Sequence, residues 1–458
     1  MNSPFAKIRD VALLVWAFLL PLQTRYFLHP GQLNGTWEYG TLSMYATDGI
    51  LLVALLCSFC TDRAWLWKRP KDLPRSVLVA ALAVVASVLF SSVNALDVGV
   101  ALGVSLRFVL GLAAAWLIAK SSIRMTAFAV VLAVSAAFES ILMLTQFVLQ
   151  TIPASTLFGI AAHAPSVAGD AVVETSIGRF LRSYGTLPHP NMAAGWLAFG
   201  LIICVVLYLR FKDPLERAVV LSGFSMITAG LFLSFSRAGL LGWLAVFLLL
   251  VFVLLLRERW EGHHRWHWWP QSDDIPLGLK TIKLVAAALF LLGAFLFVYA
   301  PLVHGRTSTD NRLEARSVSE RIAQIDEART IIGKYWLFGV GVGNETKAVH
   351  DVIDAGRSSW GYQPAHNVFL LLLTEIGGIG AILVVWCVVS VVRESFQELR
   401  RRWSHQWANG PPWLVFLSAG ILLLLLLGLV DHYLWSLPFG VAFSSLVFGL
   451  WLKSFRED

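Results

Sequence analysis

Charged residues are scarce in this chain, and their scarcity defines its class. Of its 458 residues only 14% are charged and 57% are hydrophobic, whereas soluble globular proteins carry about 25% charged residues. This composition excludes a water-soluble enzyme built around one packed core, and it also excludes a disordered chain. Long unbroken apolar runs exclude a transmembrane β-barrel. The sequence therefore predicts an all-α polytopic membrane protein.

Cysteine is equally uncommon. The four cysteines lie in or at the ends of apolar segments, and neither a disulfide framework nor a zinc motif is visible. The net charge of +7 does not indicate a nucleic-acid partner, because the basic residues of a membrane chain mostly set its topology.

Twelve apolar runs reach the length of roughly 20 residues that a membrane-spanning helix needs. Lys and Arg gather in every second short connection, beginning after the second run, and in the C-terminal tail. By the positive-inside rule, both ends of the chain are expected in the cytoplasm. The predicted spans lie near residues 9–27, 42–60, 76–95, 98–119, 125–150, 192–210, 216–234, 238–256, 281–303, 366–392, 413–430 and 434–452.

The predicted organisation has three parts. Residues 1–303 hold the first nine spans, with a long outer segment at 151–191. Residues 304–365 form a large outer loop, and residues 366–458 hold the last three spans. The large loop is rich in arginine, which is compatible with an outer location because long loops are translocated regardless of charge.

Part of the large outer loop is expected to be helical. Ser317 and Glu320 form an S-x-x-E pattern that is typical of a capping box at a helix start. Apolar residues follow at close to helical spacing, which predicts an amphipathic helix of about 17 residues. Gly339, Gly341 and Gly343 would end that helix.

Polar side chains at membrane depth are costly, so their positions are informative. Most of them lie at the outer ends of predicted spans or in the large loop, and they would share one layer if the helices bundle. These candidates are Arg182, Thr186, His189, Asn191, Ser234, Ser236, Arg237, Arg312, Arg316, Arg321, His366 and Asn367.

Several arginines and a histidine without paired carboxylates favour one class of substrate. Guanidinium groups bind phosphate oxygens bidentately, and histidine can accept a proton near neutral pH. A metal-dependent glycosyl transfer would instead need an outer acidic cluster such as D-x-D, and the outer Asp310, Asp326 and Asp351 are not arranged in that way. We therefore expect a pyrophosphate held by arginines, with no metal ion and no other cofactor.

Four sequence strings resemble the O-antigen ligase and polymerase superfamily. They are R-S-Y-G-T-L-P-H-P-N at 182–191, S-F-S-R-A-G-L-L-G-W at 234–243, the R-x7-R stretch at 321–329 with W-L-F-G-V-G-V-G after it, and H-N-V-F-L-L-L-L-T-E-I-G-G-I-G at 366–380. The resemblance covers roughly residues 175–392. It implies a GT-C-like, metal-independent glycosyltransferase of the bacterial inner membrane. Such an enzyme transfers O-antigen from undecaprenyl pyrophosphate to lipid A–core at the periplasmic face.

The resemblance also implies residue roles. The family's essential histidine corresponds to His366, which would act as general base on the acceptor hydroxyl, and the transfer should invert the anomeric carbon. The family's arginines correspond to Arg237 and, in the large loop, to Arg321, which would hold the departing pyrophosphate. Leu371 departs from the pattern, because the family often has Gln there. Substrate-binding roles are expected for Arg316, Arg312, Arg182, His189, Asn191, Ser236 and Asn367.

Other polar groups are interpreted as structural. Arg107 and Glu139 lie at similar depth in neighbouring predicted spans, which predicts a buried ion pair. Glu375 lies about 180° around its helix from the candidate base, so it should pack between helices and not orient that base. Asp431 and His432, in the last short outer turn, are interpreted as ordinary loop polarity.

Two other kinds of function stay open on the sequence alone. An O-antigen polymerase or a protein O-oligosaccharyltransferase would use the same donor with another acceptor, and no residue identifies the acceptor. A secondary transporter or lipid flippase would also fit twelve spans. Transporters, however, usually place ionisable groups near the membrane midplane, whereas here they gather at one face.

Overall fold

The computed structural model describes residues 3–61, 68–260, 277–307, 312–403 and 411–456. These residues are mostly helical, with two small antiparallel sheets of two strands each, so the expected all-α polytopic membrane architecture is confirmed. Eight helices of the described residues are long and apolar enough to cross a membrane. They are α4 (Arg75–Ser91, continued by η2, Ser92–Asn94), α5 (Val98–Lys120), α6 (Met125–Leu149), α7 (Pro190–Arg210), α8 (Pro214–Leu233), α9 (Arg237–Trp260), α10 (Leu277–Val298) and α15 (Gly377–Trp403).

Shorter helices cover the other predicted spans, so each predicted span contains a helix, while the count of twelve crossings stays a prediction. These helices are α1 (Pro4–Leu19), α2 (Ala46–Thr61), α16 (Trp413–Gly428) and α18 (Pro438–Lys453).

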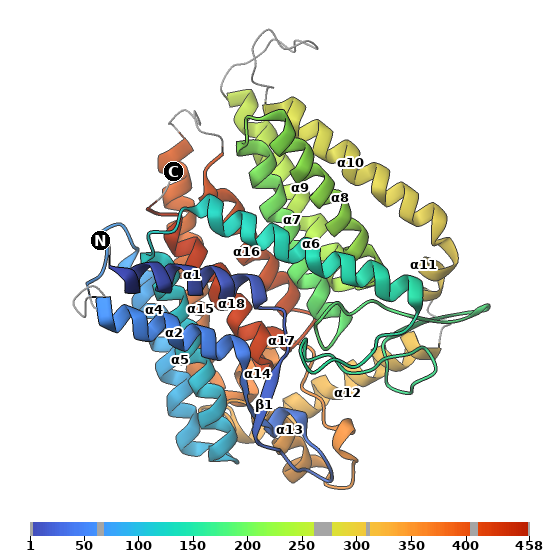
Figure 1. The fold of residues 1–458 in the computed structure, drawn as a ribbon. Coiled ribbons are helices and arrows are strands. Elements are labelled where there is room, and N and C mark those ends of the chain that lie inside the picture. The colour runs from blue at the N-terminus through green and yellow to red at the C-terminus, as the bar shows by residue number, and fades with distance from the viewer. Residues whose placement is uncertain (1–2, 62–67, 261–276, 308–311, 404–410, 457–458) are drawn as a thin grey trace.

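The first predicted span is wrong at its C-terminal end. Helix α1 ends at Leu19, shortly before Pro21, a residue that cannot continue a helix because it lacks the amide hydrogen. The chain then forms β1 (Arg25–His29), which pairs antiparallel with β2 (Leu42–Tyr45). In Figure 1, α1 and α2 lie side by side and run across the direction of α5 and α9.

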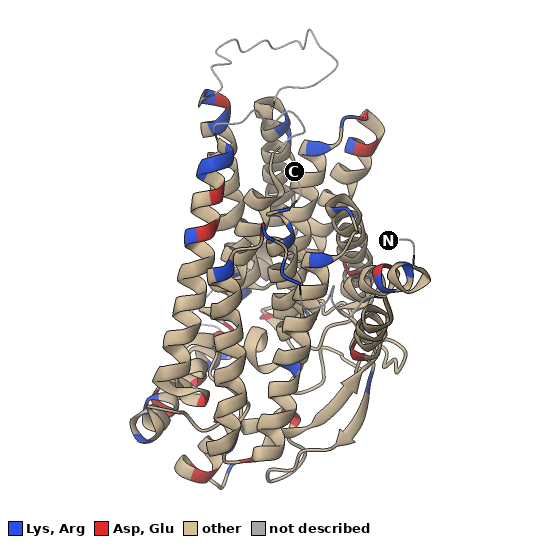
Figure 2. Cartoon of the chain, turned by 90° about the vertical axis from the view of Figure 1, so that its left-hand side faces the viewer, with Lys and Arg blue, Asp and Glu red and all other residues tan. Residues whose placement is uncertain are grey.

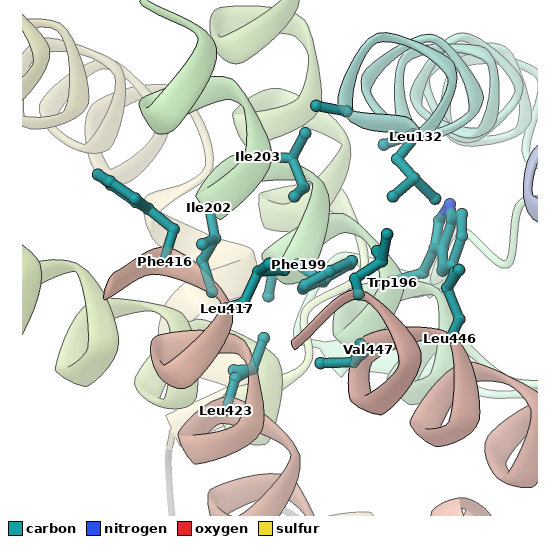
Figure 3. Packing of buried hydrophobic residues seen from close by; sticks show 14 of the residues in the cluster. Leu132, Trp196, Phe199, Ile202, Ile203, Phe416, Leu417, Leu423, Leu446 and Val447 are labelled. Atoms are coloured by element: carbon teal, nitrogen blue, oxygen red, sulfur yellow. The ribbon is translucent and has the colours of Figure 1, made fainter. Parts of the chain in front are cut away.

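Helix α7 is the centre of the bundle. All of its apolar stretch is buried, whereas the other long apolar helices have less than half of theirs buried. Figure 3 shows Trp196 and Phe199 of α7 packed among side chains of α16 and α18. Gly195 permits this approach, because a Cβ at that position would collide with the hydroxyl of Tyr433.

The tenth predicted span is broken into two helices. Helix α14 (Val368–Glu375) is separated from α15 at Gly377, whose φ of 67° favours glycine. Carbonyls at the end of α14 accept hydrogen bonds of 2.9 Å from backbone amides of the glycine-rich segment 339–343. This segment therefore supplies the hydrogen-bond donors that the last carbonyls of α14 need. These bonds hold in place the short helix that follows His366.

The two long segments that were predicted to lie outside the membrane, 151–191 and 304–365, lie at the same end of the bundle, the lower end in Figure 1. They hold most of the short elements. The remaining elements of the fold are η1 (Glu38–Gly40), β3 (Val172–Thr175), β4 (Gly178–Leu181), α11 (Ala300–Thr307), α12 (Arg312–Tyr335), α13 (Glu345–Ala348), η3 (Val349–Ile353), η4 (Ser359–Gly361) and α17 (Tyr433–Ser436).

Helix α12 is the amphipathic helix predicted in the large loop, but it is longer than predicted. Ser317 and Glu320 lie within it, so the predicted capping box is wrong. Glu320 pairs instead with Arg316 one turn earlier, at 2.7 Å. The helix ends at Tyr335, before the glycine-rich segment, as predicted.

The predicted ion pair between Arg107 and Glu139 is also wrong. Arg107 Nη1 lies 3.0 Å from Asp48 Oδ2 of α2, and Glu139 accepts hydrogen bonds from the backbone amide and hydroxyl of Thr186, at 2.8 and 2.7 Å. Equal depth along two helices does not ensure that the two side chains face each other. Arg107 and Glu139 therefore each bind a residue of another segment and not each other.

Charged side chains gather toward the two ends of the helices, and the segments between them are mostly uncharged (Figure 2). This distribution is the one that a bilayer imposes, because charge in the hydrocarbon region is costly. Glu375, a buried exception, accepts a hydrogen bond of 2.7 Å from Trp435 Nε1, which confirms its interpretation as a polar contact between helices.

Candidate functional site

The turn that joins α8 to α9 organises the site. Phe235 has a φ of 46°, a left-handed conformation that turns the chain sharply after α8. Ser236 then caps α9, since its hydroxyl accepts a hydrogen bond of 3.3 Å from the Gly239 amide. Arg237, which directly follows this turn, is the first residue of α9.

Two further arginines reach the same turn from elsewhere in the chain. Arg182 Nε donates to the carbonyl of Ser234 at 2.7 Å, and Arg306 Nε donates to the carbonyl of Phe235 at 3.2 Å. Carbonyls at the end of a helix lack partners within the helix, and cations are favourable there. Both guanidinium groups therefore bind backbone carbonyls that follow the C-terminal end of α8, next to Arg237.

A carboxylate lies among these arginines. Glu314 of α12 is buried, lies 2.7 Å from Arg237 Nη2 and also contacts Arg306. Burial, followed by the charges of Arg182, Arg237 and Arg321, lowers the pKa of Arg306 to about 8. We name Arg182, Arg237, Arg306 and Arg321 the arginine cluster. Among the described residues Arg321 has no ion-pair partner, so the cluster is suited to an anion.

A second group of side chains lies at the start of α14. His366 Nδ1 lies 3.5 Å from Asp431 Oδ1, and the rings of His366 and His432 meet edge to face with 4.8 Å between centroids. Burial raises the pKa of Asp431, but its contact with His366 and the charges of His432, His366 and His189 outweigh burial and hold that pKa well below its usual value. Asp431 is therefore an ionised carboxylate that faces an imidazole.

The neighbouring imidazoles are neutral near pH 7. Burial lowers the pKa of His189 to about 3 and that of His432 to about 4, and in both cases it outweighs the opposing charge of Asp431. His189 Nδ1 accepts the amide of Asn191 at 3.1 Å and thereby caps α7, and His432 Nδ1 lies 2.6 Å from the Ser436 hydroxyl. Both rings thus have structural partners, and His366 is the imidazole best placed for proton transfer.

Asn191 connects the two groups. Its Oδ1 accepts from Arg182 Nη2 and its Nδ2 donates to Asp431 Oδ2, each at 2.8 Å. Asp431 in turn faces His366. A continuous chain of side-chain contacts therefore joins the arginine cluster to His366, across residues from three separate parts of the sequence.

A cavity of about 390 Å³ opens beside these imidazoles, and we name it the histidine cavity. His189, His366 and His432 line one part of it. The rest is mixed polar and aromatic, a surface that can donate and accept hydrogen bonds and stack on rings. The N-terminal part of the chain contributes Gln23, Arg25, Glu38, Tyr39 and Tyr45 to that lining.

A second cavity, of about 330 Å³, lies between α9 and α10, and its lining is almost entirely apolar. Trp243, Phe247 and Leu292 are among its wall residues, and Arg237 and Arg306 also line it. We name it the apolar cavity. A hydrocarbon chain in this cavity would have its polar end next to the arginine cluster.

One group of described residues could hold a metal ion. His366, Asp431 and His432 each offer a ligand atom, and these atoms lie within 4.8 Å of one another. Two imidazoles and one carboxylate form a donor set that transition metals accept. The sequence analysis expected no metal, and it did not find this group because 65 residues separate His366 from Asp431 along the chain.

The structure separates the predicted site residues into two sets. Arg182, Asn191, Arg237, Arg321 and His366 come together as described above. Arg312 is 82% exposed and 3.9 Å from Glu174, and Arg316 is exposed and paired with Glu320.

Two other predicted site residues have structural contacts. Ser236 caps α9, and Asn367 caps α14 by accepting a hydrogen bond of 3.0 Å from the Leu370 amide. Their predicted contacts with a substrate stay predictions.

Four residues of the site were missed by sequence reasoning. Arg306, Glu314, Asp431 and His432 were assigned to loops or left without a role, and the interpretation of Asp431 and His432 as ordinary loop polarity is wrong, because both are buried against His366. An adjacent acid and histidine in a short turn between two apolar helices was the available signal. Nothing in the sequence marked Arg306 apart from the other loop arginines.

The comparisons agree with the motif analysis. Residues 223–385 match the family model described as O-antigen ligase, and this match confirms the resemblance that the sequence strings carried. The matched region includes Arg237, Glu314 and His366 but stops before Asp431. A search among curated proteins returned no match.

Proposed function

We propose that the chain, whose residues 223–385 match the O-antigen ligase family model, transfers O-antigen from undecaprenyl pyrophosphate to a sugar hydroxyl of lipid A–core, at the periplasmic face of the bacterial inner membrane. The match supports an enzyme of the glycosyltransferase type in the assembly of O-antigen and lipopolysaccharide. The observation that carries the finer proposal is the contact chain from Arg182 through Asn191 and Asp431 to His366. It joins an anion-binding cluster to a candidate base.

His366 is the proposed general base. Since its Nδ1 faces Asp431, its Nε2 would take the proton from the acceptor hydroxyl in the histidine cavity. The hydroxyl oxygen forms a bond to the anomeric carbon while the bond from that carbon to the pyrophosphate oxygen breaks, and the electron pair leaves with the pyrophosphate. Attack opposite the leaving group inverts the anomeric configuration.

Asp431 is the proposed positioning residue for this histidine. Its carboxylate is held by Asn191 and by the backbone amide of His432, at 2.8 Å in each case. A carboxylate fixed in this way stabilises the imidazolium that forms during proton transfer. With Glu375 excluded, the sequence left the orienting role to Asn367 or a loop group, and Asp431 is the loop group that faces His366.

The arginine cluster is the proposed site of the pyrophosphate. Four guanidinium groups lie near one another there, and two of them pair with a single carboxylate, Glu314. The resulting excess of positive charge stabilises the negative charge that develops on a leaving group. A pyrophosphate would compete with Glu314 for Arg237 and Arg306. The polyprenyl chain of the same donor would occupy the apolar cavity, which Arg237 and Arg306 also line. No step of this reaction requires a metal ion.

The proposal is tested by transfer in vitro with purified full-length protein, lipid-linked O-antigen and lipid A–core, with and without a chelator. Wild-type protein should transfer in both conditions. The variant His366→Ala should fold and lose transfer, and normal ligation by this variant would refute the assigned role. A strict need for divalent cations would refute the metal-independent mechanism and would indicate a metal ion held by His366, Asp431 and His432.

A matched pair of arginine variants tests the position of the pyrophosphate. Arg237→Ala should reduce transfer by at least about 100-fold, because it removes a charged hydrogen-bond donor to the leaving group. Arg316→Ala should change transfer by less than about threefold, because Arg316 is an exposed residue paired with Glu320. Equal effects of both variants would contradict the assignment of the pyrophosphate to the cluster.

The acceptor decides between a ligase and a polymerase. The same assay with lipid-linked O-antigen as both donor and acceptor would give longer chains if the protein is a polymerase. A peptide acceptor would identify a protein O-oligosaccharyltransferase.

A further inference from the structure

A lateral groove leads away from the histidine cavity on the side opposite to α9 and α10. It has a volume of about 370 Å³ and lies between the β1–β2 sheet, α2, α5 and the start of α18. Figure 1 places α2 and α5 on the left of the molecule and α10 on the right. The groove thus lies far from the apolar cavity that the donor chain is proposed to occupy.

The groove adjoins the histidine cavity. Six residues line both, so a molecule in the groove lies next to the cavity and only these side chains stand between the two. The shared residues are Arg25, Glu38, Tyr39, Tyr45, Leu437 and Pro438.

The outer part of the groove is apolar and exposed. Leu28 and Leu106, which line it from β1 and α5, are 62% and 56% exposed, and Met44 and Leu52 are also exposed. In a chain that spans a membrane, exposed apolar side chains on the helix surface face lipid. The groove therefore opens to the bilayer and accommodates a hydrocarbon chain.

The inner part of the groove is polar but balanced in charge. Arg25 Nη2 bonds Glu38 Oε2 at 3.0 Å, and Arg107 Nη1 bonds Asp48 Oδ2 at 3.0 Å. Each arginine that lines the groove is thus paired with an acid that also lines it. The arginine cluster, by contrast, has four guanidinium groups and one carboxylate that pairs with two of them, so a diphosphate is favoured there and not in the groove.

Paired ionic groups and aromatic rings are suited to sugars. Such pairs both donate hydrogen bonds to hydroxyl groups and accept from them, and they add no net charge. Tyr39 and Tyr45 line the shared part of the groove and the cavity, and the Tyr39 ring lies 5.8 Å from the ring of His432. A saccharide that passes these residues reaches the imidazole layer that contains His366.

We propose that this groove is the entry site of the acceptor glycolipid. Its hydrocarbon chains lie against Leu28 and Leu106, and its saccharide extends past the Arg25–Glu38 pair into the histidine cavity. Donor and acceptor then enter from different sides of the protein and meet at His366. This inference rests on the proposed function, and it adds which face of the molecule takes the acceptor.

Two variants on α5 test the groove. Leu106→Trp partly fills it, whereas Leu112→Trp is a matched control because Leu112 faces a different apolar pocket of the same helix. With full-length protein in lipid vesicles, Leu106→Trp should raise the KM for lipid A–core at least tenfold and leave the KM for the lipid-linked donor unchanged. Leu112→Trp should change neither. An unchanged acceptor KM for Leu106→Trp, or a raised one for Leu112→Trp, would overturn the assignment.

Photocrosslinking separates failure of this inference from failure of the proposed function. A benzophenone amino acid at position 106 should label lipid A–core, and the same probe at position 241, in the apolar cavity, should label the polyprenyl donor instead. If wild-type protein transfers glycan but the probe at 106 does not label lipid A–core, the groove assignment is wrong. If that probe labels lipid A–core but wild-type protein transfers nothing, the groove is a glycolipid site and the proposed function is wrong.

Discussion

Replacement of Asp431 by asparagine should impair transfer without unfolding the protein. The carboxylate lies 3.5 Å from His366 Nδ1. At that distance an imidazolium and a carboxylate attract each other by about 5 kcal/mol at an effective dielectric constant of about 20. Because the His366 side chain is 28% exposed, solvent reduces this figure, and about 3 kcal/mol is a reasonable expectation. That loss corresponds to a roughly 100-fold lower transfer rate.

The assay is the rate of transfer at saturating donor and acceptor, so that binding changes do not contribute. Asp431→Asn keeps the shape of the side chain, and its one amide oxygen can still accept from either Asn191 or the backbone amide of His432, so the fold should persist. Size-exclusion chromatography and thermal unfolding check this. The KM values for both substrates should change little, since Asp431 acts through His366.

Glu375→Gln is the matched control. Glu375 is another buried acid, but it accepts a hydrogen bond from Trp435 Nε1, and no contact between Glu375 and His366 is found among the described residues. It should leave the rate at saturation within about threefold of wild type. If Asp431→Asn also retained a rate within about fivefold, His366 would not need a fixed carboxylate, and the positioning role would be refuted.

Three other substitutions test separate features. Glu314→Gln should lower the KM for the donor severalfold, because it removes the carboxylate that competes for two arginines of the cluster; an unchanged or raised KM would contradict that competition. Gly185→Ala should lower the free energy of unfolding by about 1–3 kcal/mol, measured by thermal unfolding, because φ is 64° there and a Cβ would collide with Glu139. The lowered pKa of His189, about 3 when folded against about 6.5 when unfolded, means that the unfolded state binds more protons below pH 6.5. Stability should therefore fall by about 2 kcal/mol between pH 6.5 and 5, and His189→Asn, which keeps a capping group that does not titrate, should lose less.

The helices were largely predictable because their cause is local. A stretch of apolar residues as long as a bilayer is thick requires a helix wherever it occurs, and helices were found at each predicted span. The failures lie where a helix ends for other reasons. Pro21 ended the first helix early, and Gly377 divided the tenth span because the glycine-rich segment 339–343 supplies hydrogen bonds to the break.

Partners of charged groups were not predictable in the same way. Arg107 and Glu139 have matching depth, yet Arg107 pairs with Asp48 and Glu139 binds Thr186. Depth follows from position along a helix, but contact also depends on which faces of two helices meet, and that is set by packing. The same reason explains why Arg312 and Arg316 lie outside the arginine cluster while Arg306 belongs to it.

The amino-acid order alone determined that this is a helical membrane protein, which of its ends carry polar chemistry, and that Arg237 and His366 stand out among them. Folding in three dimensions decided that Asp431 faces His366, that Arg306 and Glu314 join the cluster, and that a groove beside α5 adjoins the histidine cavity. The physical reason is that hydrophobic length and helix capping act between near neighbours in the chain, whereas ion pairs and cavities arise between residues that only the packing of distant helices brings together.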